Sequence, residues 1–293
     1  MTVVTMKIGI VISGGDVSGI NNFIFQVAKL ASAEITIFNG GIPGLLDKNH
    51  QEIAWRDLVD FSICSLPVIT SGRTTRKLLR SEYETIARKI KSLRLDVLIM
   101  AGGDGSLQFL NTLSEFDINC FGVGMTIDND VYGSDYTIGF STACEQIIKE
   151  VSRLRNTGRA LPGRVFMVEI LGGYCGELTL QSAIKSNADI ALIPEAQMPL
   201  EDLAERVRRK LREQNSVVIL CSEGYTSEYS PGFQGAIDTM IKQLEPRIGV
   251  RIRKTIIGYG LRSGDPTCEE IYQGTIMANE VVRCIQSGMK NKA

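Results

Sequence analysis

Three carboxylates lie close together in this sequence, among glycines and hydroxyl side chains. They are Asp128, Asp130 and Asp135, within the stretch Gly122–Ala143 that includes the end of an apolar run. Acidic side chains at the end of a buried strand are typical of a functional site, because ligands of open α/β sheets collect at the carboxyl ends of the strands. This stretch is therefore the first candidate site.

Two further glycine-rich turns have the same setting. Ser13–Gly19 follows the apolar run Lys7–Ile12, and Ala101–Ser106 follows the apolar run of 96–100. Each pattern predicts a strand, a glycine turn and then a helix, an arrangement in which backbone N–H groups and a helix N-terminus face an anion. Three such turns on one sheet indicate phosphoryl transfer.

The elements that must position these turns alternate along the chain. Apolar runs and helical periodicity predict strands at 7–12, 34–38, 96–100, 119–123, 164–170, 189–193, 216–221 and 254–258, and a short strand followed by a turn within 67–73. They predict helices at 19–32, 81–93, 106–113, 143–154, 177–185, 200–213, 236–244 and 267–287. The segment 39–44 is expected to be a loop. Alternating strands and helices predict an α/β fold with mainly parallel sheets.

The composition is that of a globular protein with one large or two medium domains. The chain has 293 residues, of which 44% are hydrophobic and 22% charged, and its net charge is -1. We expect no nucleic-acid partner, because a net charge this close to zero creates no overall field that would attract a polyanion. We expect no membrane partner, because the same holds for an anionic membrane surface and no apolar segment has the roughly 20 residues that span a bilayer. Seven scattered cysteines and the absence of a signal-peptide pattern at the N-terminus favour a cytoplasmic location.

Several motifs resemble the 6-phosphofructokinase family over nearly the whole chain. Its TIDND motif stands at Thr126–Asp130, its GGDGS at Gly102–Ser106 and its SGGD turn at Ser13–Asp16. Further matches are Arg164, Tyr174–Gly176, Pro194–Glu195, Glu223 and the stretch 253–262.

The resemblance implies a fold and an assembly. The family has two similar open, mainly parallel three-layer sheets of Rossmann-like type, facing a cleft. We expect a donor-binding domain of 1–139 plus 254–293 and a sugar-phosphate-binding domain of 140–253. In the family, the residues that match Arg164 and Arg253 reach across a subunit interface, so a complete site implies a homodimer or homotetramer.

The resemblance also assigns catalytic roles. Asp128 would be the base that takes the proton of the attacking hydroxyl, Thr126 a hydrogen-bond donor, and Asp130 a third catalytic residue. Asp104 would anchor Mg2+, which needs only one or two carboxylates beside phosphate oxygens. Capping of a helix N-terminus is the structural alternative for Asp104 and Asp130.

The remaining site residues divide between donor and acceptor. The residues expected to bind the donor are Gly14, Gly15, Arg73, Gly103, Gly105, Ser106 and Phe109. The residues expected to bind the phosphorylated sugar are Arg164, Leu171, Glu223, Arg253, Tyr259 and Arg262. For the arginines and Glu223 the alternative is a surface ion pair, and for the basic run that begins at Arg73 it is a solvated helix start.

The sequence also departs from the family pattern. Gly173 replaces an arginine that stabilises the transferring phosphoryl group, and Tyr259 replaces a phosphate-binding histidine. Met125 is neither the glycine associated with ATP nor the lysine associated with pyrophosphate. Phe109 stands where a small glycine is usual, so its ring would either stack on the adenine base of the donor or occupy the space of that base. Ile42 stands where ATP-dependent members often have a tyrosine.

Three hypotheses follow from these observations. The first is a glycolytic kinase that moves the γ-phosphoryl group of ATP to the 1-hydroxyl of fructose 6-phosphate, favoured by Asp128, Asp104, Gly105 and the three acceptor arginines. The second is the same chemistry with pyrophosphate as donor or another phosphorylated sugar as acceptor, favoured by the departures. The third is a regulatory or binding paralogue without turnover, against which the retained Asp128 and Asp104 count.

Overall fold

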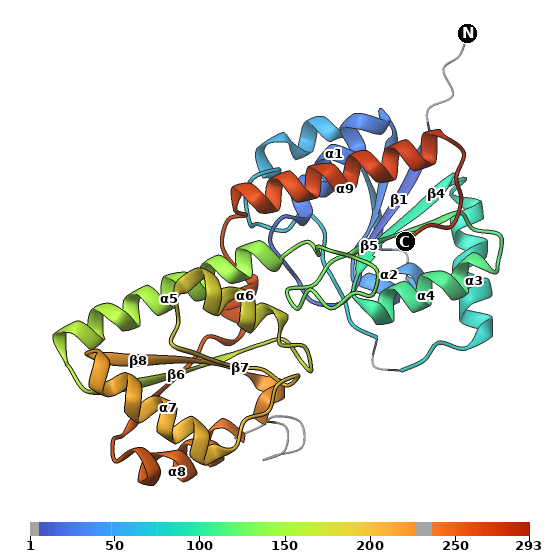
Figure 1. Cartoon of the computed structure of the whole chain (residues 1–293). Helices are drawn as coiled ribbons and strands as arrows, with labels where there is room; N and C mark the ends of the chain where they lie inside the picture. The colour runs from blue at the N-terminus through green and yellow to red at the C-terminus, as the bar shows by residue number, and fades with distance from the viewer. Residues whose placement is uncertain (1–5, 48, 75, 227–235) are drawn as a thin grey trace. The chain divides into compact units, whose positions relative to one another are not determined.

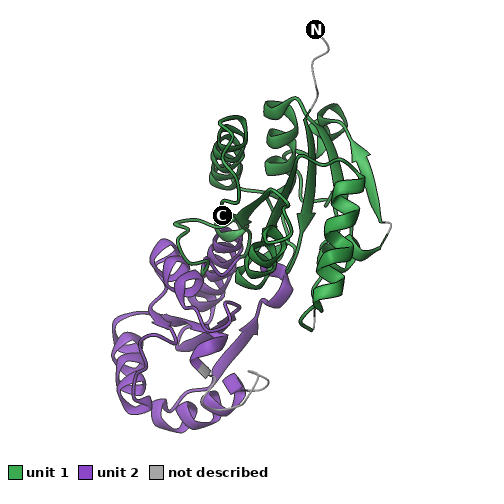
Figure 2. Ribbon diagram, turned by 90° about the vertical axis from the view of Figure 1, so that its right-hand side faces the viewer, with its two compact units in different colours: residues 1–126, 130–142, 262–293 green, residues 127–129, 143–261 purple. Residues whose placement is uncertain are grey.

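The computed structural model describes residues 6–47, 49–74, 76–226 and 236–293, which form two compact units (Figure 2). Unit 1 comprises Met1–Thr126, Asp130–Thr142 and Arg262–Ala293, and unit 2 comprises Ile127–Asn129 and Ala143–Leu261. The chain therefore passes from unit 1 to unit 2 mainly at 142–143 and returns at 261–262. We expected these passages after Gly139 and near Arg253. The return is later because the strand around Arg253 pairs inside unit 2.

Unit 1 is built on a five-stranded sheet in the order β3-β2-β1-β4-β5. Its strands are β1 (Lys7–Ile12), β2 (Glu34–Phe38), β3 (His50–Ile53), β4 (Val97–Gly102) and β5 (Cys120–Gly124). All neighbours are parallel except β2 and β3. The apolar runs predicted four of these strands. The edge strand β3 was missed, because its sequence His-Gln-Glu-Ile is polar and its burial is only partial.

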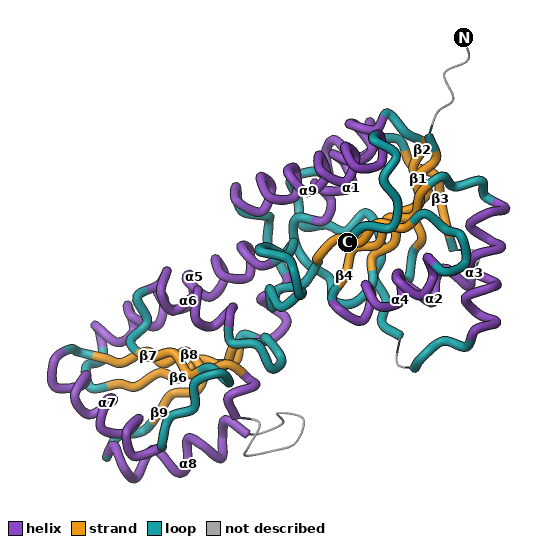
Figure 3. Tube along the Cα trace, turned by 45° about the vertical axis from the view of Figure 1, so that its right-hand side comes forward, coloured by secondary structure: helices purple, strands orange, loops and turns teal. Residues whose placement is uncertain are grey.

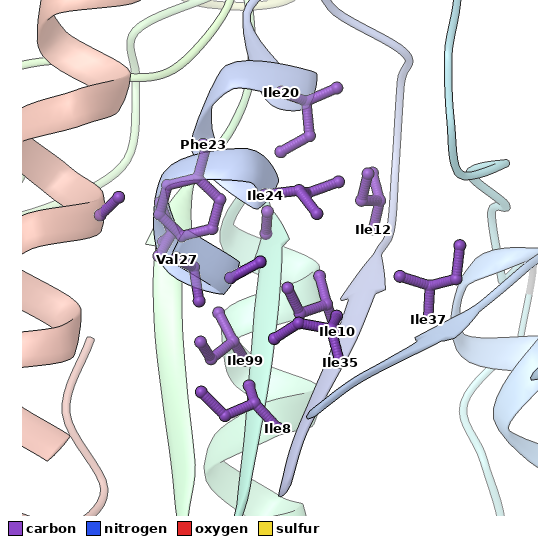
Figure 4. Close-up of a cluster of buried hydrophobic side chains, with 14 of the residues drawn as sticks. Ile8, Ile10, Ile12, Ile20, Phe23, Ile24, Val27, Ile35, Ile37 and Ile99 are labelled. Carbon is purple, nitrogen blue, oxygen red and sulfur yellow. The ribbon is translucent and has the colours of Figure 1, made fainter. Parts of the chain in front are cut away.

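Helices cover both faces of this sheet, which gives three layers (Figure 1). One face is covered by α1 (Ile20–Ala31) and α9 (Cys268–Gln286), and the other by α2 (Gly41–Leu46), α3 (Arg80–Ser92) and α4 (Asp104–Ser114). Phe23, Ile24 and Val27 of α1 pack on Ile10 of β1 and Ile99 of β4 (Figure 4). This apolar layer holds the strand ends that carry the glycine turns.

Two predictions in unit 1 were wrong. The segment 39–44 is not a loop throughout, because α2 begins at Gly41; positive φ angles at Gly40 and Gly41 turn the chain into the helix. The short strand predicted within 67–73 is absent from the described residues of that range, where only an isolated parallel bridge joins Gly72 to Ser13.

Unit 2 has a four-stranded parallel sheet in the order β7-β8-β6-β9. Its strands are β6 (Arg164–Ile170), β7 (Ile190–Leu192), β8 (Ser216–Ser222) and β9 (Ile252–Ile256). The helices α5 (Phe140–Ala160) and α6 (Glu177–Ser186) lie on one face, and α7 (Leu200–Glu213) and α8 (Ala236–Ile248) lie on the other (Figure 3). The two sheets, each flanked by helices, confirm the predicted fold class. Among the described residues, no helix is both long enough and apolar enough to cross a membrane.

Candidate active site

The first glycine turn follows β1 and is held by neighbouring backbone. Gly14 has φ 110°, and its N–H donates a hydrogen bond to the carbonyl of Gly72 at 3.1 Å. At Gly15 a Cβ atom would lie 2.1 Å from Nη1 of Arg262, so the guanidinium lies directly against this glycine. Arg262 also pairs with Asp16 at 3.8 Å. A cation thus lies beside the first turn.

The second glycine turn leads into α4. A side chain at Gly103 or Gly105 would meet no atom within 4 Å, so the space beside these residues is open. Asp104, the first residue of α4, is exposed. The α4 N-terminus therefore presents open backbone N–H groups of the kind that bind phosphate.

Hydrogen bonds join the first turn to the second. The Ser106 side chain is buried, and its hydroxyl donates to the carbonyl of Ser13 at 3.3 Å. The backbone N–H of Ser13 donates to the carbonyl of Ala101 at 2.9 Å. The two turns consequently lie side by side at the carboxyl ends of β1 and β4. The Ser106 hydroxyl links the two turns, and the expected contact of Ser106 with the donor stays a prediction.

The acidic turn follows β5, the next strand of the sheet. The Met125 N–H donates to the carbonyl of Gly102 at 3.0 Å, and the Thr137 hydroxyl donates to the carbonyl of Thr126 at 2.7 Å. Asn129 has φ 54°, which gives the sharp turn between Asp128 and Asp130. Thr126 and Asp130 belong to unit 1, whereas the half-buried Asp128 belongs to the short stretch assigned to unit 2.

Asp104 and Asp130 interact electrostatically within unit 1. Desolvation raises the pKa of the Asp130 carboxyl, and the negative charge of Asp104 raises it further. Carboxylate oxygens beside a phosphate-type turn are the ligand type that a hard cation such as Mg2+ prefers. No group of three or more potential metal ligands occurs among the described residues.

Two residues expected at the donor side have different surroundings. Arg73 is exposed and directly follows Gly72, which bonds to Gly14, so the chain places Arg73 next to the first turn. Phe109 is only 5% exposed and stacks on Tyr83 with ring centroids 5.1 Å apart. Phe109 therefore offers almost no surface to a ligand.

Three predicted acceptor residues lie at the carboxyl edge of the unit 2 sheet. Leu171 follows β6, Glu223 follows β8, and Tyr259 follows β9. Oε1 of Glu223 accepts hydrogen bonds from the backbone N–H groups of Gly172 and Gly173, at 3.0 and 2.7 Å. The ring of Tyr259 is 78% exposed. This edge combines an oriented carboxylate with an accessible hydroxyl.

Arg164 and Arg253 lie near the opposite edge. Arg164 is the first residue of β6, and Arg253 pairs in register with Phe166. A seven-residue strand such as β6 is about 20 Å long. The structure consequently separates these two arginines from Leu171, Glu223 and Tyr259 of the same chain. Arg262, the sixth predicted acceptor residue, lies in unit 1 at the first turn.

Sequence reasoning missed two residues that shape the site. Glu270 is a buried carboxylate on α9 that accepts hydrogen bonds from the segment following the acidic turn. Tyr83 on α3 is the stacking partner of Phe109. Tyr83 belongs to no motif that the sequence analysis identified. The signal for Glu270 was the acidic pair Glu269–Glu270 at the start of a predicted helix.

Glycine turns beside an acidic turn, at the carboxyl ends of parallel strands, define a phosphotransferase of the α/β class. The phosphofructokinase family model matches residues 7–285. The chain belongs to the phosphofructokinase family and is a phosphofructokinase-like phosphotransferase.

Two relatives differ in the donor that they use. The chain is 32% identical to an ATP-dependent 6-phosphofructokinase of Spiroplasma citri, over 97% of this chain and 85% of that protein. It is 28% identical to a pyrophosphate–fructose 6-phosphate 1-phosphotransferase of Dictyoglomus thermophilum, over 97% of this chain and 87% of that protein. Both kinds of donor therefore occur among its relatives.

Solved structures agree with the fold. A phosphofructokinase of Pichia pastoris superposes with a TM-score of 0.86 at 25% identity, over 97% of this chain. This chain spans 35% of that protein chain and 42% of a matched phosphofructokinase chain of Saccharomyces cerevisiae.

Proposed function

We propose that this protein moves the γ-phosphoryl group of ATP to the 1-hydroxyl of fructose 6-phosphate. Asp128 takes the proton as the hydroxyl oxygen bonds to phosphorus, the bond from phosphorus to the bridging oxygen breaks, and ADP leaves. Thr126 donates a hydrogen bond to the substrate. Positioning and neutralisation of charge carry most of the catalysis in such transfers.

The open α4 N-terminus carries this proposal. Gly103 and Gly105 leave space for phosphate oxygens next to backbone N–H groups, and Arg73 and Arg262 bring positive charge to the neighbouring turn. Gly14 would let the chain approach the phosphates closely, and Gly15 lets the Arg262 guanidinium lie against the same turn. The name of the Spiroplasma citri relative supports ATP as donor.

Asp104 and Asp130 would hold Mg2+. Their mutual repulsion in unit 1 fits a site that a divalent cation neutralises, and Mg2+ takes its remaining ligands from water and phosphate oxygens. Bound there, Mg2+ would neutralise charge on the donor phosphates. Asp130, which we expected to be a catalytic residue, would then serve as a second metal anchor beside Asp104.

The acceptor site would use residues from two subunits. Glu223, Leu171 and Tyr259 contact the sugar at the carboxyl edge of the unit 2 sheet. Arg164 lies at the other end of β6, about 20 Å away along the strand, and Arg253 pairs with Phe166 in the first half of β6; both would bind the sugar phosphate of a partner subunit. This separation supports a homodimer or homotetramer.

Pyrophosphate is the second candidate donor. Phe109 is buried against Tyr83 and Ile42 is 5% exposed in the α2 layer, so neither offers a surface to a nucleotide base. Met125 is 2% exposed and its side chain belongs to the core, so it adds neither charge nor obstruction to the donor site. The Dictyoglomus thermophilum relative is named for pyrophosphate.

We place the reaction in the cytoplasm. No disulfide joins any of the seven cysteines in the described part of the chain, which fits a reducing compartment.

A matrix of donors against acceptors tests the proposal. ATP, ADP and pyrophosphate are each combined with fructose 6-phosphate and with other phosphorylated sugars, and product phosphate esters are quantified. ATP with fructose 6-phosphate should give the highest kcat/KM. A higher value with pyrophosphate would select the second candidate, and no transfer in any combination would indicate a regulatory paralogue.

A further inference from the structure

Glu270 is a buried carboxylate that none of the proposed catalytic steps uses. It lies in the first turn of α9, and 0% of its surface is exposed. Within the described part of the chain it forms no ion pair, so hydrogen bonds alone compensate its burial. A buried polar group without such compensation costs about 1–3 kcal/mol, and Glu270 is therefore tied closely to its hydrogen-bond donors.

These donors all come from the segment 136–142. Oε1 accepts the Gly139 N–H at 2.6 Å, and Oε2 accepts the N–H and the hydroxyl of Thr142 at 3.0 and 3.1 Å. The Tyr136 hydroxyl also bonds to the carboxylate. Since α5 begins at Phe140, Glu270 caps this helix from another helix, where a negative charge is favoured.

The same segment holds the backbone of the acidic turn. The Thr137 hydroxyl donates to the carbonyl of Thr126 at 2.7 Å, and the Ile138 N–H donates to the carbonyl of Gly124 at 3.0 Å. Thr137 and Ile138 are both 0% exposed. Thr126 precedes Asp128 by two residues, so hydrogen bonds and a short stretch of chain connect Glu270 to the catalytic residues.

Close packing leaves Glu270 little freedom. A Cβ atom at Gly19, which has φ 93°, would lie 2.5 Å from Cγ of Glu270. A Cβ atom at Gly139, which has φ 108°, would lie 2.5 Å from Cβ of Val17. The end of the first glycine turn, the segment 136–142 and α9 therefore meet around this carboxylate.

We propose that Glu270 is a positioning residue for phosphoryl transfer: it fixes the segment 136–142 and, through Thr137 and Ile138, the backbone at Gly124–Thr126. This inference rests on the proposed function for its kinetic consequence. A carboxylate is required because all of its partners donate. Glutamine at this position would point an NH2 group at N–H or O–H donors and leave at least one of them without an acceptor.

Glu270→Gln tests the proposal, with Glu269→Gln as the matched control. Glu269 is the preceding residue on α9, but it is exposed and bonds to Gln273. A displacement of about 1 Å can cost about 100-fold in rate, so we expect Glu270→Gln to lower kcat by up to about 100-fold, with both KM values retained and Glu269→Gln unchanged. An unchanged kcat for Glu270→Gln, or equal losses in both variants, would overturn the proposal.

A double variant separates positioning from a general loss of stability. Thr137→Val removes the hydrogen bond to Thr126, so adding it to Glu270→Gln should slow the enzyme no further if both residues act on the same turn. Multiplicative losses would overturn the connection through Thr137. If Glu270→Gln does not fold, Tyr136→Phe removes one donor and should give a smaller loss of kcat at retained KM; no loss would count against the proposal.

Hydrogen exchange tests the contact without relying on activity. In Glu270→Gln the amides of Ile138, Gly139 and Thr142 should lose protection, while amides of α3 should keep theirs. Retained protection at all three amides would overturn the positioning role. A wild-type protein that transfers no phosphate would refute the proposed function, and the exchange result would still decide whether Glu270 holds the segment.

Discussion

The Glu223 carboxylate accepts a hydrogen bond from the backbone N–H of Gly173 at 2.7 Å. Gly173 has φ 56°, and a Cβ atom there would meet no atom within 4 Å. The residue proposed to bind sugar hydroxyls is therefore oriented by the turn at which the resemblance led us to expect an arginine. The structure gives this turn space for a longer side chain but a backbone conformation that favours glycine.

Gly173→Arg tests whether the missing cation limits the rate. We expect kcat to rise by about tenfold or more, because a charged donor at the transferring phosphoryl group stabilises the transition state. The left-handed backbone should make the variant about 1–2 kcal/mol less stable. Gly173→Gln carries the same backbone strain without the charge and is the control; an equal kcat for both variants would contradict the prediction.

Phe109→Ala tests the aromatic contact between α3 and α4. Removing this buried ring should lower the free energy of unfolding by about 3–5 kcal/mol, measured by urea denaturation. If ATP is the donor, the KM for ATP should stay nearly unchanged, because the ring has almost no surface on which a base could stack. A KM for ATP that falls by tenfold or more, in an enzyme that already uses pyrophosphate, would show that the ring excludes the base.

The main elements of the fold could be predicted because each has a local cause. Apolar runs ending in glycine turns located β1 and β4, and helical periodicity located α1 and α9. The polar edge strand β3 and the short helix α2 could not be predicted, because pairing with β2 and the positive φ angles at Gly40 and Gly41 determine them.

The residues of the candidate site likewise divide into those that the sequence predicts and those that only the folded structure reveals. Residues within motifs, such as Asp104 and Asp128, could be identified from the sequence. The position of Arg262 against Gly15, the burial of Phe109 against Tyr83 and the role of Glu270 depend on contacts between residues far apart in the chain, which no local pattern encodes.

Arg253→Ala tests the assignment of the acceptor phosphate. We expect the KM for the sugar phosphate to rise much more than the KM for the donor, because the variant removes a cation from the acceptor side alone. Steady-state kinetics with each substrate varied in turn gives both values. Equal effects on the two KM values would indicate a role in folding or assembly.

Mixing variants tests the shared site. Arg253→Ala and Asp128→Asn subunits, unfolded and refolded together, should regain activity at low sugar phosphate, because some sites would combine an intact Asp128 with an intact Arg253 of the partner. A mixture no more active than the sum of the two separate variants would contradict a site built from two subunits.

The pH dependence of stability tests the burial of Glu270. Desolvation raises the pKa of its carboxyl above the ordinary value of 4.5, although hydrogen bonds from Gly139 and Thr142 oppose the rise. Between the ordinary and the raised pKa the unfolded chain binds fewer protons than the folded chain, so this group's contribution to stability falls as pH increases. We expect urea unfolding to show a smaller fall in stability above pH 4.5 for Glu270→Gln than for the wild type. Parallel pH profiles would contradict this expectation.

Phosphate transfer by the wild type and by Asp128→Asn tests the central claim most directly. With ATP and fructose 6-phosphate, 31P NMR should show a new phosphate ester on the 1-hydroxyl together with ADP. Asp128→Asn should bind both substrates but turn over about 10²- to 10⁴-fold more slowly, the range for a positioned general base. A wild type that forms no such ester, or an Asp128→Asn variant with near-normal turnover, would contradict the account.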